Sequence, residues 1–122
     1  MTKILVIDDE AVLREEIVEL LMLEGYEVRG AADGRSGIDT VVQYQPNIIL
    51  CDVTMPGMNG YDVLAELRQT EATRHISFIF MTAHAFRDDV LRGIDLGADG
   101  YLIKPFYHKD LMDAIENCLD KK

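Results

Sequence analysis

The feature that most constrains the fold is a regular alternation of short apolar runs with longer segments of helical periodicity. The apolar runs, rich in Ile, Val and Leu, predict strands at Lys3–Asp8, Tyr26–Ala31, Asn47–Asp52, Ser77–Thr82 and Asp99–Ile103. The amphipathic segments predict helices at about Ala11–Leu23, Gly34–Tyr44, Tyr61–Gln69, Asp88–Leu96 and His108–Leu119. Strands that alternate with helices form a parallel sheet with helices on both faces. The sequence therefore predicts a doubly wound α/β fold with a five-stranded parallel sheet and five helices.

The buried face of the second predicted helix follows from the spacing of its apolar residues. Residues three and four apart lie on one side of a helix, so we expect Ile38, Val41 and Val42 to face the sheet. Pro46 is expected to stop this helix, because the residue before a proline avoids helical backbone angles. The same periodicity places Leu111, Ala114, Ile115 and Cys118 of the last helix inward.

Charge and composition restrict the partners. The chain has 122 residues, which suits one domain, and a formal net charge of −10. This charge opposes direct binding to nucleic acid or to an anionic membrane surface. The longest run without a charged residue, Thr40 to Cys51, is too short to cross a membrane. The N-terminus does not resemble a signal peptide, and the two cysteines, Cys51 and Cys118, have no metal-type or redox-type spacing. We therefore expect a cytoplasmic protein with free thiols.

Polar side chains stand where the predicted strands end. They are Asp8 and Asp9 after the first strand, Asp52 after the third, Thr82 after the fourth and Lys104 after the fifth. In open α/β sheets ligands bind outside the carboxyl ends of the strands, so we expect these groups to converge. Three carboxylates in one cleft repel one another unless cations balance them. Mg²⁺ and Lys104 would supply that balance, and such a site can hold a transferring phosphoryl group with one aspartate as nucleophile.

Four segments of the chain resemble the receiver domain of bacterial two-component response regulators, of the chemotaxis-regulator type. The segments are residues 7–10 (IDDE), 52–60 (DVTMPGMNG), 81–83 (MTA) and 97–106 (GADGYLIKPF). The resemblance extends over essentially the whole chain. It implies a single receiver domain, residues 1–122, with a flavodoxin-like sheet in the order 2-1-3-4-5. It also implies that the chain catalyses only its own phosphorylation and dephosphorylation.

The resemblance also implies roles for the acidic residues. Asp52 would accept a phosphoryl group from the phosphohistidine of a histidine kinase or a histidine phosphotransfer protein. Asp9 and Asp52 would bind Mg²⁺ directly, and Asp8 would act mainly through water. The backbone carbonyl of Thr54 would complete the protein ligands.

Three further residues would respond to the phosphoryl group. By the same resemblance, Thr82 would hydrogen-bond a phosphoryl oxygen and Lys104 would pair with its charge. Tyr101 would be the aromatic switch, which turns inward when Thr82 moves toward the phosphate. The peptide bond between Lys104 and Pro105 is expected to be cis.

Two side chains are expected to tune how long the phosphorylated state lasts. Hydrolysis of the acyl phosphate requires water to attack in line. By resemblance, the side chains two positions after Asp52 and Thr82 flank that line, and here they are Thr54 and His84.

The signal is expected to leave through the surface formed by the fourth helix, fifth strand and fifth helix, where a downstream protein would bind. Regulators that dimerise through this surface usually carry a second acid after the position of Asp99 and a basic residue near position 114. This chain has Gly100 and Ala114 instead, so we expect a monomer or a weak dimer.

Several other interpretations remain open. The segment could be a receiver cut from a longer regulator or a hybrid kinase, although residues 1–122 themselves leave no room for an output domain. A magnesium-dependent phosphohydrolase of the haloacid-dehalogenase type would place its nucleophile on the first strand in Asp-x-Asp spacing, whereas Asp8 and Asp9 are adjacent. A pseudo-receiver would lack part of the acidic and Thr/Lys set. Neither common phosphate-binding glycine motif is present, which disfavours a nucleotide-binding domain.

Overall fold

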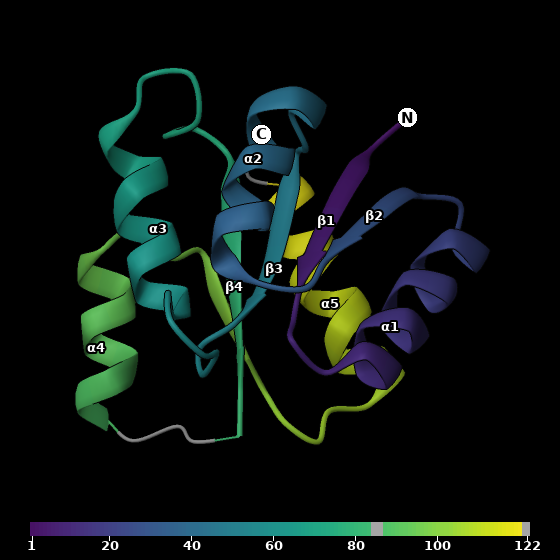
Figure 1. Cartoon of the computed structure of the whole chain (residues 1–122). Coiled ribbons are helices and arrows are strands. Elements are labelled where there is room, and N and C mark those ends of the chain that lie inside the picture. The colour runs from purple at the N-terminus through teal and green to yellow at the C-terminus, as the bar shows by residue number, and fades with distance from the viewer. Residues whose placement is uncertain (84–86, 121–122) are drawn as a thin grey trace.

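The computed structural model describes residues 1–83 and 87–120, and within them strands and helices alternate along the chain (Figure 1). The strands are β1 (Lys3–Ile7), β2 (Glu27–Ala31), β3 (Ile48–Asp52), β4 (Ser77–Thr82) and β5 (Gly100–Ile103). The helices are α1 (Ala11–Leu23), α2 (Gly34–Tyr44), α3 (Gly60–Gln69), α4 (Arg87–Asp95) and α5 (His108–Asp120). All neighbouring strands are parallel and their order is β2-β1-β3-β4-β5, which confirms the predicted fold.

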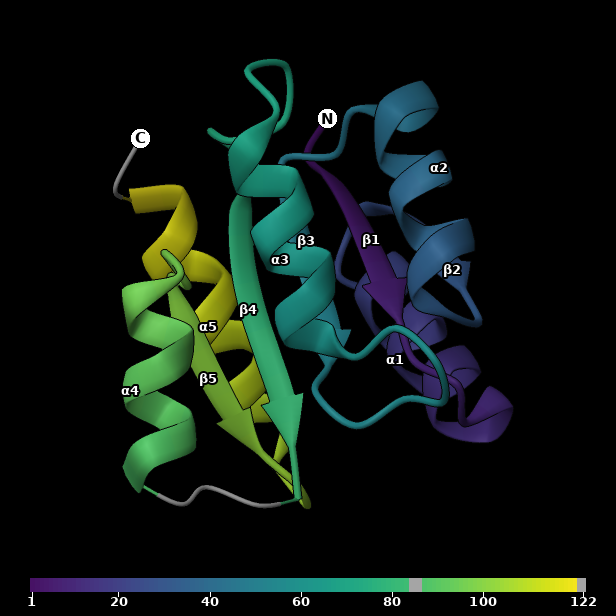
Figure 2. The same cartoon turned by 60° about the vertical axis from the view of Figure 1, so that its left-hand side comes forward.

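Helices cover both faces of the sheet. On one face α1 and α5 lie against the strands, and on the other lie α2, α3 and α4 (Figures 1 and 2). Each face has its own apolar core, one built around Phe78 and Phe80 and the other around Ile79 and Met81. Every residue of the central strands β3 and β4 is buried, because both of their faces are covered.

Backbone pairing brings the carboxyl ends of four strands to one level. In the register of the sheet, Ile7 pairs with Cys51, Asp52 with Met81, and Thr82 with Ile103. Hydrogen bonds continue this pairing beyond the strands, from Val53 N to Met81 O at 3.0 Å and from Lys104 N to Thr82 O at 2.7 Å. The carboxyl ends of β1, β3, β4 and β5 therefore lie side by side at one edge of the sheet.

The start of α3 is set by a capping box and a close backbone approach. Asn59 accepts a hydrogen bond from Asp62 N, and the Asp62 carboxylate accepts one from Asn59 N. This cap starts the helix at Gly60, one residue before the predicted start. A Cβ on Gly60 would lie 2.5 Å from the backbone oxygen of Asp52, so the glycine lets α3 begin directly against the end of β3.

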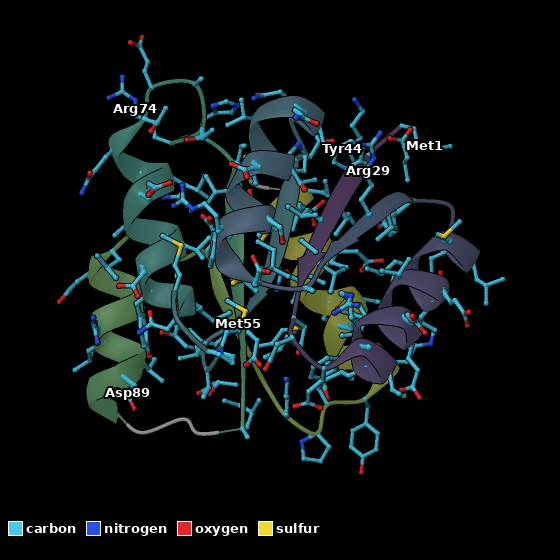
Figure 3. The ribbon with its side chains drawn as sticks, in the orientation of Figure 1. Met1, Arg29, Tyr44, Met55, Arg74 and Asp89 are labelled. Carbon is cyan, nitrogen blue, oxygen red and sulfur yellow. The ribbon has the colours of Figure 1, made fainter. Side chains whose placement is uncertain are left out.

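The predicted inward face of α2 was wrong at one position. Ile38 and Val41 are buried as expected, but Val42 is 61% exposed. The buried stripe turns instead toward Gly37 and Tyr44, and the Tyr44 ring lies under the Arg29 guanidinium at 4.2 Å (Figure 3). A position four residues after Ile38 therefore falls beyond the edge of the stripe.

None of the helices in residues 1–83 and 87–120 combines the length and the hydropathy that crossing a bilayer requires.

Candidate functional site

A pocket opens at the carboxyl edge of the sheet, between the loops that follow β1, β3, β4 and β5. Its lining residues are Asp9, Glu10, Asp52, Thr54, Ala83 and Lys104. The neighbouring strand ends contribute two more buried polar side chains, Asp8 and Thr82. The structure thus brings together the strand-end residues that the sequence singled out.

Lys104 is the cation at the base of this pocket. Its Nζ lies 3.0 Å from Asp8 Oδ2 and 3.4 Å from Asp52 Oδ2. Burial by itself lowers the pKa of Lys104, but the hydrogen bond to Asp8 and the negative charges of Asp52 and Asp8 outweigh burial and raise the pKa above its ordinary value. Lys104 therefore stays protonated and bridges two carboxylates that would otherwise repel each other.

Asp52 ends the central strand and is only 5% exposed. Its Oδ1 accepts a weak hydrogen bond from Thr54 N at 3.4 Å. Desolvation by burial raises the pKa of the Asp52 carboxyl; Lys104 lowers it in part, and the charge of Asp8 raises it further. The ionised carboxylate is therefore poorly solvated and only partly balanced, which suits a nucleophile.

The incompletely balanced charge of Asp52 should lower the stability of the folded protein. An acid whose pKa is raised in the folded state destabilises the fold once it ionises. This penalty shrinks as the pH falls below the folded pKa and is gone below the unfolded pKa. We expect Asp52→Asn to raise the free energy of unfolding at pH 7, by about 1.4 kcal/mol for each unit by which folding raises the pKa. Urea unfolding at pH 7 and at pH 4 measures this, and the gain should shrink at the lower pH.

The matched control for that measurement is Asp39→Asn, which removes an exposed carboxylate on α2. A gain in stability of the same size for both variants at pH 7 would show that lower net charge, and not relief at Asp52, is the cause.

The acidic cluster differs in one member from the set singled out in the sequence. Ligand oxygens of Asp8, Glu10 and Asp52 lie within 4.8 Å of one another. In the sequence, Glu10 belongs to the segment 7–10 that carries the resemblance, but no role is predicted for it. It occupies the N-cap position of α1 without making a side-chain cap hydrogen bond, so its carboxylate is available to the pocket. Asp9 lines the same pocket and is exposed at its rim.

The donor set fits a hard divalent cation. Carboxylate oxygens are the ligands that Mg²⁺ prefers, and a cation that keeps several waters does not require a closed cage of protein ligands. Asp8 is fully buried, and its Oδ1 already accepts a hydrogen bond from Glu10 N at 2.9 Å. The more exposed carboxylates of Asp9 and Glu10 are therefore the ones with room for further ligands.

The remaining predicted residues differ in how closely they approach the pocket. Thr54 is exposed and lines it, whereas Thr82 is buried at the end of β4. Tyr101 is half-buried on β5, and its ring centroid lies 5.2 Å from that of Phe80. The Lys104–Pro105 bond is cis, as predicted. His84 lies outside the described residues.

Comparisons with known proteins agree on one family. A family model described as the response regulator receiver domain matches residues 4–116. The transcriptional regulatory protein PdtaR of Mycobacterium tuberculosis is 38% identical over 116 residues, which is 93% of this chain and 55% of PdtaR. The probable transcriptional regulator ycf29 of Pyropia yezoensis is 35% identical over 96% of this chain and 53% of its own length. This chain thus spans about half the length of these curated relatives.

Among solved structures, the chemotaxis protein CheY4 of Vibrio cholerae superposes with a TM-score of 0.93 at 29% sequence identity. The match covers 97% of this chain and 98% of the CheY4 chain. The similarity therefore extends over a whole structural unit, including all five strands.

Proposed function

Because the chain belongs to the response regulator receiver domain family, we propose that Asp52 accepts a phosphoryl group from the phosphohistidine of a histidine kinase or a histidine phosphotransfer protein. One observation carries the proposal. The Asp52 carboxylate stands at the buried end of the central strand, 3.4 Å from the Lys104 ammonium, in a pocket that opens past Asp9, Glu10 and Thr54.

The transfer exchanges one bond to phosphorus for another. A carboxylate oxygen of Asp52 attacks the phosphorus, the bond from phosphorus to the donor imidazole nitrogen breaks, and that nitrogen leaves with the electron pair and takes up a proton. Lys104 faces the charge that develops on the phosphoryl oxygens, and the Thr82 hydroxyl would bind one of them. By the family resemblance, Asp9, Asp52 and the Thr54 carbonyl would hold a Mg²⁺, with Asp8 acting through water, and the ion would supply further positive charge for the phosphoryl oxygens.

Labelling with a small phosphodonor tests the proposal. Incubation with acetyl phosphate and Mg²⁺ should add a single phosphoryl group, about 80 Da, in the intact mass spectrum. The modification should be lost with hydroxylamine, as expected of an acyl phosphate. No gain in mass, or a gain that resists hydroxylamine, would contradict it.

We also propose that Thr54 limits the lifetime of the phosphorylated state. Its short exposed side chain lines the pocket and leaves space for water to approach in line with the scissile bond. Thr54→Arg should therefore lengthen the half-life of phospho-Asp52, while Mg²⁺ affinity stays nearly unchanged because only the backbone of residue 54 would bind the ion. The decay of the phosphorylated mass after donor removal measures the half-life.

His84→Ala belongs in the same series, since His84 is the second position expected to flank the attacking water. Its imidazole can block access and can also orient water, and these effects oppose each other. Identical decay rates for the wild type, Thr54→Arg and His84→Ala would show that neither side chain gates the water.

The partner for the signal would bind the surface formed by α4, β5 and α5. This surface exposes Leu91, Ile94 and Ile103, which are 46%, 54% and 45% accessible. Apolar side chains at these positions suit a protein partner better than nucleic acid, and the net charge of −10 also opposes nucleic acid. With Gly100 and Ala114 in place of a charged pair, we propose that the receiver is a monomer or a weak dimer.

A further inference from the structure

Two tyrosine hydroxyl groups from different elements converge on one backbone carbonyl of α4. Tyr61, in the first turn of α3, donates a hydrogen bond from Oη to Asp89 O at 3.1 Å. Tyr101, on β5, donates to the same oxygen at 3.0 Å. Asp89 lies near the start of α4, on the side of the molecule where α3 and α4 run next to each other (Figure 3). The position of this end of α4 is thus tied to both α3 and β5.

The aromatic rings beneath these hydroxyl groups form a continuous row. The Tyr61 and Phe80 centroids are 5.1 Å apart, and the Phe80 and Tyr101 centroids are 5.2 Å apart. The Arg92 guanidinium of α4 also lies over the Tyr61 ring, 4.5 Å from its centroid. Tyr61 therefore holds α4 through its ring as well as through its hydroxyl group.

Gly93 provides the space for this arrangement. Among residues 89–95 of α4, whose burial the structure describes, Gly93 is the only buried one. A Cβ at this position would overlap the Tyr101 hydroxyl group and would lie 2.7 Å from Tyr101 Cζ and 3.0 Å from Phe80 Cε2. The Tyr101 ring can occupy its place only because residue 93 has no side chain.

We propose that Tyr61 is a positioning residue of the switch. The hydroxyl groups of Tyr61 and Tyr101 together fix the start of α4 through their hydrogen bonds to Asp89 O. Gly93 is the seat of the Tyr101 ring, that is, the position on α4 against which the ring packs. As a statement about regulation it rests on the proposed function, because α4 belongs to the surface through which the phosphorylated receiver would signal. Movement of α4 then requires the release of two hydroxyl groups, and one of them belongs to α3, directly after the loop that begins at Asp52.

Amide hydrogen exchange in α4 tests this hold on the free protein. Tyr61→Phe and Tyr101→Phe each keep the ring and remove one hydroxyl group. A neutral hydrogen bond corresponds to a roughly two- to tenfold change in an opening equilibrium, so each variant should speed exchange in α4 by about that factor. The double variant should exchange faster than either. Unchanged α4 exchange in Tyr61→Phe would overturn the proposal.

Tyr107→Phe is the matched control, because Tyr107 is 82% exposed and its side chain lies at the start of α5. It should leave exchange in α4 at the wild-type rate. If Tyr107→Phe speeds exchange in α4 as much as Tyr61→Phe does, the effect does not depend on the hydrogen bonds to Asp89 O, and the proposal is wrong.

Gly93→Ala separates the effect of helix propensity on amide exchange in α4 from the effect of steric overlap with Tyr101, because the two predict opposite changes. Alanine favours helix over glycine, so propensity alone predicts slower exchange in α4. The overlap with Tyr101 predicts the reverse, namely faster exchange together with a shift of the Tyr101 ring resonances as the ring leaves its seat. Slower exchange with unshifted Tyr101 resonances would contradict the seat.

The effect on regulation is measured separately with Mg²⁺ and beryllofluoride, a phosphoryl mimic. In Tyr61→Phe the acetyl phosphate labelling should stay at the wild-type level, because Tyr61 does not line the pocket, while the beryllofluoride-induced resonance shifts in α4 should decrease. Failure of the wild type to take up a phosphoryl group would refute the proposed function. Normal labelling of the wild type with unaltered α4 behaviour in Tyr61→Phe would refute only the present inference.

Discussion

Asp52→Asn should abolish the mass gain of about 80 Da that acetyl phosphate and Mg²⁺ produce. The amide nitrogen and oxygen of asparagine nearly match the shape of the carboxylate, but neither atom is a competent nucleophile toward phosphorus. The effect is expected to be complete, since Asp8, the other buried carboxylate among the residues whose burial the structure describes, has its Oδ2 bound to Lys104 at 3.0 Å and its Oδ1 bound to Glu10 N. Intact mass spectrometry of both proteins under one condition measures it.

Circular dichroism must show that the Asp52→Asn protein is folded, and loss of the buried negative charge should make it more stable than the wild type at pH 7. Asp39→Asn, on the exposed side of α2, should be labelled normally. Labelling of Asp52→Asn to the wild-type level would rule out Asp52 as the acceptor, since another side chain would then carry the phosphoryl group.

Removal of divalent metal is the second change with a very large expected effect. Excess EDTA should reduce acetyl phosphate labelling to background, because Lys104 is the single cation among the described residues that line the pocket, and Asp8, Glu10 and Asp52 crowd the site with negative charge. A dianionic phosphodonor gains too little from one ammonium group to enter such a pocket. Labelling that persists undiminished in EDTA would contradict the metal requirement.

Two variants distinguish which exposed carboxylate matters to the metal. The family resemblance implies that Asp9 would bind Mg²⁺ directly, whereas the geometry of the structure groups Glu10 with Asp8 and Asp52. We expect Glu10→Gln to weaken Mg²⁺ binding by about 10- to 100-fold, which is typical of losing a carboxylate that supports the site without binding the ion, and Asp9→Asn to weaken it more because a direct ligand would be lost. Isothermal titration with Mg²⁺ measures both, and Glu19→Gln, on the exposed part of α1, is the control. Equal affinities for all proteins would refute a role for either residue.

The sheet was predictable because the sequences of its central strands are compatible with few other secondary structures. Runs such as Ile48–Leu50 are apolar without interruption, which in a chain this short fits only a strand with both faces covered. Helix starts were predictable to within a residue where a capping signal stands in the sequence, as Asn59 and Asp62 do for α3. The exposure of Val42 on α2 was not predictable from the sequence. Which face of a short helix is buried also depends on contacts with other elements, such as the packing of Arg29 on Tyr44.

The candidate site was predictable to the extent that it depends on strand ends. The end of a strand can be read from the sequence, and the parallel register then aligns those ends without further information. The position of Glu10 was not predictable in this way, since the distance of its carboxylate from Asp52 depends on the backbone conformation at the start of α1. The contacts of Tyr61 and Tyr101 with Asp89 join residues 28 and 12 positions apart, and they leave no periodic signal, because Tyr61 looks in the sequence like any apolar residue of an amphipathic helix.

The placement of Asp9 and Glu10 at the mouth of the pocket, with Lys104 at its base, also has a kinetic consequence. An approaching ion meets the exposed carboxylates first and the ammonium group last. The exposed carboxylates attract a cation and repel a phosphate ester or an acyl phosphate, so we expect the metal to associate faster than the donor and to favour donor binding once it is bound. At a fixed donor concentration the rate of labelling should then rise with Mg²⁺ to a plateau, and saturating donor alone should not replace the metal.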